Sequence, residues 1–532
     1  MSTRLAGLDR LLRLALRRDR VILPASVLGL VLLSVGSAQA TLALFPDDAS
    51  AVAGLADVVG NPAVVAMYGP ISAADADALA VFKTVMMGAV LVAVLAVVLV
   101  RRHTRTEEEE GRLELVGAGA VGRWAPLAAA VVVALLGVVA ASGLSALGLV
   151  ALGMDPAGSL AFGVAWATAG LAWVGITATA VQLASTTRGA GGLAFGALGA
   201  AFVLRAAADS VDGGVVHALG WLSPLGWSGR VEPYGRDRAW VLLLGLGVLV
   251  VGVAAGLAVL GRRDLGAGVL PPRLGPARAA RRLSGPVALV ARLATGTVVG
   301  WVVGMLVGGV VLGSLLGAVG DLTANPAMAR FLEALGGSAG TIEDVYLASE
   351  TRFLAVAVAA AGVALVLRLG AAERSGIGES VLSTGTSRLR WYAAHVLVAV
   401  LATTLFLVVV GATVGLVGAR ASSTAPGFWA ALGAFVSTLP AVWVLVGVAA
   451  LLVGARPRTA PLAWGLLLVG FVVGELGPTM DLPGWLVDAS PFAHLGQLPG
   501  GEFAALAAVV MTLLGAGLAA AGALAYDRRD VA

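Results

Sequence analysis

Long apolar segments recur along the whole chain, and they constrain its fold more than any other feature. A helix that crosses a bilayer needs about 20 mostly apolar residues. Only 12% of the residues are charged, about half the share found in soluble domains. The sequence therefore predicts an all-α polytopic membrane protein with about 12 transmembrane helices, at residues 21–44, 80–100, 126–152, 160–185, 190–205, 239–260, 295–317, 352–369, 392–418, 428–454, 460–476 and 503–525.

The charge distribution predicts how these helices are oriented. Cytoplasmic loops of membrane proteins collect lysine and arginine. Most of the 35 basic residues fall on one side of the membrane if the N-terminus is cytoplasmic, and most acidic residues then fall outside. We therefore expect a multi-pass protein of the cell (cytoplasmic) membrane with both termini in the cytoplasm. This orientation explains the excess of basic over acidic residues, so no nucleic-acid partner is expected.

The chain also contains an internal repeat with an offset of about 265 residues. The sequences Asn-Pro-Ala at 61–63 and Ser-Pro at 223–224 recur at 325–327 and 490–491. Between them, the alignment matches Gly111 with Gly376, Glu114 with Glu379, and Arg123 with Arg388. Recurrence in unchanged order indicates a duplicated unit. Two halves of six helices enter the membrane in the same direction, so they are parallel pseudo-repeats.

These features divide the chain into four parts. Residues 1–20 carry leucines at helical spacing among six arginines, which predicts a cytoplasmic amphipathic surface helix rather than a signal peptide. Residues 21–260 form the first six-helix half, and residues 295–532 form the second. Between them, 261–294 is expected to be a basic, proline-containing cytoplasmic linker that ends in a second surface helix. Long external segments after the fifth helix of each half predict a partly inserted hairpin.

No enzyme motif is complete in this sequence. A phosphate-binding loop requires glycines before a Lys-Ser or Lys-Thr pair, but the only lysine, Lys83, follows DALAVF. The G-x-S-x-G sequence at 336–340 falls in a predicted external loop, whereas a nucleophile needs a strand-to-helix turn. The four histidines lack metal-ligand spacing. We therefore expect no catalytic residue, no metal site and no cofactor in this chain itself.

Charged residues are almost absent from the middle of the predicted helices. Proton-coupled carriers usually keep acidic groups there. A transporter that lacks such groups must take its energy from another source. Gly296, Gly300, Gly304 and Gly308 form a ladder along the seventh helix. Small residues at this spacing let another helix approach closely, which predicts a helix-packing face.

The most charged segment connects the second and third helices, at residues 101–127. Glu108 and Arg112 have the i, i+4 spacing of a helical ion pair, and Glu107, Glu110 and Glu114 share one helical face. The pattern predicts a short surface helix that ends near Gly117. A solvated charged loop is the alternative. The second copy in the other half favours a docking element for a symmetric cytoplasmic partner.

Four stretches resemble the ABC-2-type permeases of high-GC Gram-positive bacteria known as polyketide-antibiotic exporters. They are NPAVVAMYGP at 61–70, RRHTRTEEEEGRLELVGAGAVGR at 101–123, WLSPLGW at 221–227 and GPVALVARLATGTVVGW at 285–301. The resemblance implies the ABC-2 (type V exporter) fold and two copies of a separate cytoplasmic ABC ATPase that carries ATP and Mg²⁺. By this analogy the ATPase-coupling residues are Glu109, Glu110, Gly111, Arg112, Glu114, Arg123, Glu379 and Arg388. The second copy departs from the pattern, because Ile377 replaces the arginine.

We therefore predict the permease subunit of an ATP-driven exporter that moves hydrophobic or amphipathic compounds, such as an antibiotic, drug or lipid-like molecule, out of the cell. A proton-coupled 12-helix secondary efflux carrier of the major-facilitator type is the alternative, and a membrane scaffold or lipid-modifying enzyme is a third. Membrane lipid and a hydrophobic small molecule are the other expected partners. Six aromatic residues are candidates for an apolar substrate path: Trp166, Trp173, Trp301, Phe353, Trp443 and Trp464.

Overall fold

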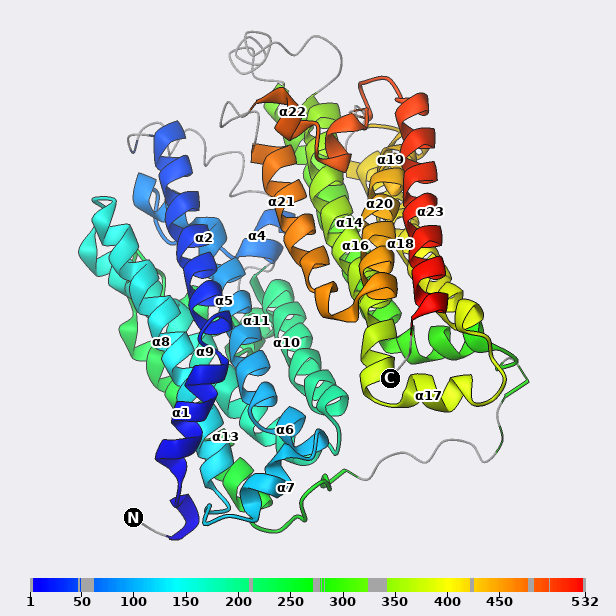
Figure 1. The fold of residues 1–532 in the computed structure, drawn as a ribbon. Helices are drawn as coiled ribbons and strands as arrows, with labels where there is room; N and C mark the ends of the chain where they lie inside the picture. The colour runs from blue at the N-terminus through cyan, green and yellow to red at the C-terminus, as the bar shows by residue number, and fades with distance from the viewer. Residues whose placement is uncertain are drawn as a thin grey trace. The chain divides into compact units, whose positions relative to one another are not determined.

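Helices account for all the regular structure in the part of the chain that is described, which comprises residues 3–45, 48, 62–209, 214–270, 278, 280–281, 283–323, 342–421, 425–476, 483–496 and 498–529. The structure is a computed structural model (Figure 1). Within these residues, eleven helices are long and apolar enough to cross a membrane. This confirms the predicted all-helical, polytopic fold. The predicted segment at 460–476 forms a shorter helix, α21 (Leu462–Leu476), of 15 residues.

The first of two compact units comprises Met1–Gly275. Its longest helices are α2 (Ile22–Leu44), α5 (Ala76–Arg102), α8 (Ala125–Ala151), α9 (Pro156–Leu183), α10 (Thr187–Asp209) and α13 (Leu242–Leu260). The shorter elements are η1 (Thr3–Leu5), α1 (Leu8–Arg18), α4 (Pro62–Tyr68), α6 (Arg105–Glu109), α7 (Arg112–Gly117), α11 (Gly214–Leu219), η2 (Gly220–Leu222), α12 (Gly226–Arg230) and η3 (Ala239–Val241). Helix α9 lies at the centre of this unit, because it packs against α5, α8, α10 and α13.

The second unit comprises Pro276–Ala532. Its helices are α14 (Pro286–Thr323), α16 (Ile342–Arg374), α17 (Ile377–Leu382), α18 (Arg388–Ala421), α19 (Phe428–Ser437), α20 (Leu439–Ala455), η4 (Pro457–Thr459), α21, α22 (Gly484–Val487), η5 (Pro491–His494) and α23 (Ala505–Arg528). The predicted span at 428–454 is divided into α19 and α20 at Thr438. Pro440 explains the division, because proline has no N–H to donate to the preceding turn.

The same helix pairs pack together in both units. In the first unit, α9 packs against α5, α8 and α13. In the second unit, α20 packs against α16, α18 and α23. The fourth and last helices approach so closely that a Cβ at Gly252 would overlap the carbonyl of Gly175, and one at Gly447 would overlap the carbonyl of Gly515. Glycine is required at such backbone contacts, which fix the last helix against the fourth.

Among the described residues, no atom outside the local backbone of α14 lies within 4 Å of a Cβ built at Gly296, Gly300, Gly304 or Gly308. The predicted glycine ladder therefore has no packing partner in the described part of its own unit. Two other glycines of α14, Gly309 and Gly313, lie against α18 instead. A packing role for the ladder therefore stays a prediction.

The N-terminal segment is helical, as η1 and α1, and α1 packs against α8. Its placement on the cytoplasmic membrane surface stays a prediction. The segment expected to form a second surface helix does not form a separate element. It is the beginning of α14, which continues for 38 residues. At 1.5 Å per residue, α14 is about 57 Å long, well beyond the roughly 30 Å hydrocarbon core of a bilayer.

A hairpin made of α11, η2 and α12 folds back into the first unit between α10 and α13. The Ser228 hydroxyl donates a hydrogen bond of 2.8 Å to the carbonyl of Ala165 in α9. The Ser223 hydroxyl donates one of 2.7 Å to the carbonyl of Ala201 in α10. Both serines are fully buried, so the turn from η2 to α12 packs among the helices, whereas α11 contains no buried residue. Insertion of this hairpin into the membrane stays a prediction. Residues 325–327 and 336–340, which carry the second Asn-Pro-Ala and the G-x-S-x-G sequence, lie outside the described residues.

Candidate functional site

The charged connector between α5 and α8 forms two short helices, α6 and α7, at one end of the first unit (Figure 1). Gly111 separates them with a φ of 70°, in the left-handed region that glycine adopts at least cost. The prediction of one continuous helix is therefore wrong, and so is the predicted pair of Glu108 with Arg112. Arg112 instead forms ion pairs with Glu107, at 2.8 Å, and with Glu110.

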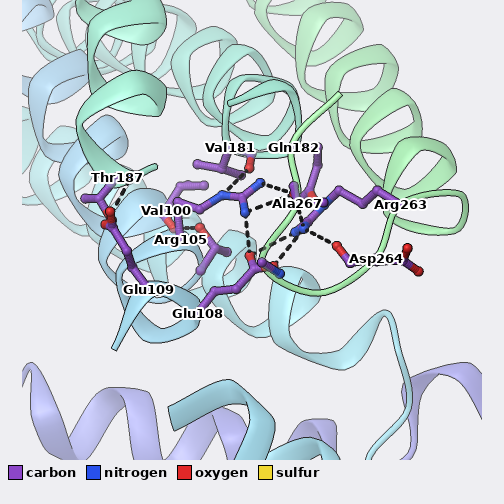
Figure 2. A network of polar contacts seen from close by, with 12 residues as sticks. Val100, Arg105, Glu108, Glu109, Val181, Gln182, Thr187, Arg263, Asp264 and Ala267 are labelled. Atoms are coloured by element: carbon purple, nitrogen blue, oxygen red, sulfur yellow. Dashed lines mark hydrogen bonds and ion pairs between the residues drawn. The ribbon is translucent and has the colours of Figure 1, made fainter. Parts of the chain in front are cut away.

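Glu108 is the buried centre of a polar network (Figure 2). Arg263 donates two hydrogen bonds to its carboxylate, of 2.7 and 2.9 Å. The N–H of Gly266 donates a third, of 2.6 Å, and Arg105 forms an ion pair at 3.0 Å. The side chains of Glu108 and Arg263 are only 4% and 7% exposed. The network therefore joins α6 to the chain that follows α13.

The remaining donors of the two arginines are also bonded. Arg263 donates to the side-chain oxygen of Gln182 at 2.7 Å. Arg105 donates to the carbonyls of Val181, at 2.9 Å, and Ala267, at 3.2 Å. Buried guanidinium groups need such partners to offset their loss of hydration. The site therefore holds two cations and one carboxylate in a specific arrangement.

Two other glutamates of the connector hold neighbouring helices. The Glu109 carboxylate accepts the N–H of Thr187, the first residue of α10, at 3.0 Å. A carboxylate at this position satisfies a free N–H and interacts favourably with the helix dipole. Glu107 forms an ion pair of 2.6 Å with Arg18 at the end of α1. The hydrogen bonds from Arg112 to Glu107 raise the pKa of Arg112 above its usual value.

The junction between α1 and α2 is attached to the same end of the unit. The fully buried carboxylate of Asp19 lies 2.5 Å from Nε2 of His103 and 3.0 Å from Nε of Arg102. Both partners belong to the end of α5. Ion pairs and hydrogen bonds therefore join six segments at one place, namely α1, α5, α6, α7, α10 and the chain after α13.

A cavity of about 330 Å³ lies beside this network. Its walls come from α6, α7, the start of α8 and the residues that follow α13. The lining is mostly apolar, and its polar groups include Glu108, Arg123, Gln182 and Arg263. Within the described residues, no cluster of three or more histidine, aspartate or glutamate side chains is placed to hold a metal ion.

The second unit carries a helix with the same geometry as α7. Gly376, with a φ of 73°, precedes the six-residue helix α17, just as Gly111 precedes the six-residue helix α7. The carbonyl of Glu114 accepts the N–H of Ala118, and that of Glu379 accepts the N–H of Ser383, at 3.0 and 2.9 Å. The aligned glutamates therefore occupy equivalent positions, and both side chains are exposed.

Sequence patterns located this end of each unit but missed its buried residues. Arg105, Glu108 and Arg263 were not predicted as site residues. Glu108 and Arg263 are 155 residues apart, so no local spacing links them. The repeat did identify Arg123 and Arg388, which donate hydrogen bonds to the carbonyls of Arg263 and Arg529, the latter at 2.8 Å.

The aromatic residues predicted to line a substrate path have different surroundings. Trp166 and Trp173 are fully buried in the first unit, and Trp166 donates to the carbonyl of Thr84 at 3.1 Å. Trp301 stacks on Phe406 with ring centres 5.9 Å apart. The others belong to α16, α20 and α21: Phe353 and Trp464 are 46% and 42% exposed, and Trp443 lines a groove of about 430 Å³. Their role in transport stays a prediction.

Comparison with known proteins places this chain among membrane permeases. The family model described as "Multidrug efflux system permease Rv1217c, C-terminal domain" matches residues 8–261 and 283–527. Each matched range contains one of the two short helices, α7 or α17. The multidrug efflux system permease protein Rv1217c of Mycobacterium tuberculosis (strain ATCC 25618 / H37Rv) is 37% identical over 528 residues, which cover 98% of this chain and 94% of that protein.

Proposed function

Because this chain belongs to the family of multidrug efflux system permeases, we propose that it is the membrane subunit of an ATP-driven exporter of the ABC-2 type. A separate ATPase supplies the energy. The exported compounds are hydrophobic or amphipathic, and they leave across the cell membrane. The end of each unit that carries α7 or α17 faces the cytoplasm, where two copies of the ATPase bind ATP and Mg²⁺.

The observation that carries this proposal is the pair of matching short helices. Each follows the second long helix of its unit, each begins after a glycine with positive φ, and each exposes a glutamate at the same position. Each short helix also exposes an apolar side chain, Leu115 (79% exposed) in α7 and Ile377 (43%) in α17, although at positions that do not align in the repeat. Two matching helices with aligned, exposed glutamates suit a partner that is present in two copies.

The structure narrows the residues that such a partner can contact. Glu109 and Arg112 are bonded to side chains or helix ends of their own unit. Glu110 pairs with Arg112, but its side chain is 47% exposed, and Glu114 is exposed as well. We therefore propose Glu110, Glu114 and Leu115 as the ATPase contact in the first unit, and Glu379 with Ile377 in the second.

Co-purification tests this function directly. The affinity-tagged chain is extracted from its native membrane in a mild detergent, and the bound proteins and ATP hydrolysis are measured. The test variant carries Glu114→Arg and Glu379→Arg. We expect an ATPase to accompany the parent and the double reversal to lower its recovery by about tenfold or more, because like charges across an interface cost several kcal/mol.

The control reverses an exposed carboxylate outside both short helices, with Glu502→Arg. It should retain the ATPase at the parent level. If no ATPase accompanies the parent, and uptake of ethidium into inverted vesicles follows an imposed proton gradient instead, the secondary-carrier alternative replaces this proposal.

A further inference from the structure

A second repeated arrangement lies next to the short helices. In the first unit, Glu108, Arg123 and Arg263 join three segments: the end of α6, the residues just before α8, and the residues just after α13. Arg263 binds the Glu108 carboxylate through both terminal nitrogens, at 2.7 and 2.9 Å. Its backbone carbonyl accepts a hydrogen bond from Nη2 of Arg123. We call these three residues the first clasp.

The second unit contains a corresponding set of three residues, joined by one ion pair and one hydrogen bond to a carbonyl. Nη2 of Arg529, just after α23, lies 2.6 Å from Oε1 of Glu373 at the end of α16. The carbonyl of Arg529 accepts a hydrogen bond of 2.8 Å from Arg388, the first residue of α18. We call Glu373, Arg388 and Arg529 the second clasp. Its residues follow those of the first clasp by 265, 265 and 266 positions, which is the offset of the repeat.

Each clasp encloses one short helix in the sequence. Helix α7 lies between Glu108 and Arg123, and α17 lies between Glu373 and Arg388. Both flanks are therefore attached to a single residue at the end of the last membrane helix. The glutamate side chains are only 4% and 5% exposed. Charged hydrogen bonds are strong in such surroundings, and leaving one partner unpaired is costly. The three segments of a clasp should therefore move together.

We infer that the two clasps are positioning devices that transmit movement of α7 and α17 to α13 and α23, the last helices of the two units. The inference rests on the proposed function for the source of the movement, which is the ATPase bound to the short helices. It assigns Glu108, Arg123 and Arg263, and their counterparts Glu373, Arg388 and Arg529, to the coupling path. They act behind the docking surface, because their carboxylates are buried.

The second clasp is the better one to test. In the first clasp, Arg105 and the N–H of Gly266 also bind Glu108. Replacing Glu108 would therefore leave two buried arginines without their carboxylate partner. Gly370 stands in the second unit at the position aligned with Arg105. Glu373 therefore lacks a second arginine, although Tyr526 lies beside it, and Glu373→Gln removes its charge while preserving its shape.

Hydrogen exchange on the purified full-length chain tests the mechanical link without any ATPase. In Glu373→Gln we expect exchange to rise about tenfold, which corresponds to 1.4 kcal/mol of local stability, both at residues 383–388 and at the end of α23. The charge swap Glu373→Arg with Arg529→Glu should restore both regions toward parent rates. Asp527→Asn, which removes an exposed carboxylate two residues before Arg529, is the matched control and should change neither. A rise in only one of the two regions would overturn the inference.

A spectroscopic measurement on the complex with its ATPase distinguishes two roles of the second clasp. The clasp either transmits movement to α23 or only stabilises the local structure. The chain has no cysteine, so Arg528→Cys provides one spin label at the end of α23. In this background ATP should alter the label's mobility. Glu373→Gln should abolish that response while ATP hydrolysis stays within about twofold, and the charge swap should restore it. An unchanged ATP response in Glu373→Gln refutes the inference. If no ATPase co-purifies, the proposed function fails, and the exchange result still decides whether the clasp links the two regions.

Discussion

Replacing Glu108 with glutamine should destabilise the first unit more than any other single change in the connector. Its carboxylate neutralises Arg105 and Arg263, whose side chains are only 1% and 7% exposed. Glutamine keeps the shape but leaves both cations without a counter-ion. Removing one partner of a buried ion pair costs about 3–5 kcal/mol. The neighbouring Glu110 is 47% exposed and its partner Arg112 is 42% exposed, so Glu110→Gln should cost only about 0–1 kcal/mol.

Thermal unfolding of the purified chain measures this difference. At about 2 °C per kcal/mol for a unit of this size, Glu108→Gln should lower the midpoint by about 6–10 °C and Glu110→Gln by at most about 2 °C. Adding Arg263→Gln should cost less than the sum of the single changes, by about 1–3 kcal/mol, because the two residues interact directly. A Glu108→Gln midpoint equal to that of Glu110→Gln, or strict additivity with Arg263→Gln, would refute the assignment of Glu108 as the counter-ion.

Three further predictions follow from local geometry. Gly252→Ala should destabilise the packing of α13 on α9 by about 1–3 kcal/mol through overpacking, whereas Gly247→Ala, on an open face of the same helix, should not lower the unfolding midpoint. Gly111→Ala should cost about 1–2 kcal/mol because of its left-handed backbone; Gly117→Ala, which meets no neighbour, is its control in the same unfolding assay, and equal midpoints would contradict the argument. Glu109→Gln should speed hydrogen exchange in the first turn of α10, because a lost N-terminal cap costs about 0.5–2 kcal/mol, and unchanged exchange near Thr187 would show that the contact contributes nothing.

The membrane helices were predictable because bilayer thickness imposes a minimum length on every apolar run. The predicted end of the second span, at residue 100, lies two residues from the observed end of α5 at Arg102. The starts of two other helices were missed by more, because α14 begins at Pro286 rather than 295 and α16 begins at Ile342 rather than 352. The break between α19 and α20 was not foreseen, although Pro440 marks it. Propensity alone does not settle that question, since neighbouring helices let membrane helices tolerate proline.

The polar network could not be predicted from local spacing. The connector reads as one helix, and a single glycine inside a helical pattern does not force a break. Once Gly111 divides the segment, Glu108 turns inward and Arg112 joins Glu107. The partner of Glu108 comes from 155 residues away. Only the internal repeat carried long-range information. It aligned Arg123 with Arg388, and the structure shows that each donates a hydrogen bond to a carbonyl after the last helix of its unit. Their role in ATPase coupling stays a prediction.

The close approach of the fourth and last helices in each unit sets a limit on how either unit can deform. Where Gly175 faces Gly252, and Gly447 faces Gly515, backbone touches backbone. No side chain at these points can change its rotamer to let one helix shift along the other. Each pair of helices should therefore move as one rigid body. If the end of α13 or α23 is displaced, the packed helix α9 or α20 should move in the same direction. A passage for an exported molecule should therefore open at helix interfaces other than α9–α13 and α20–α23.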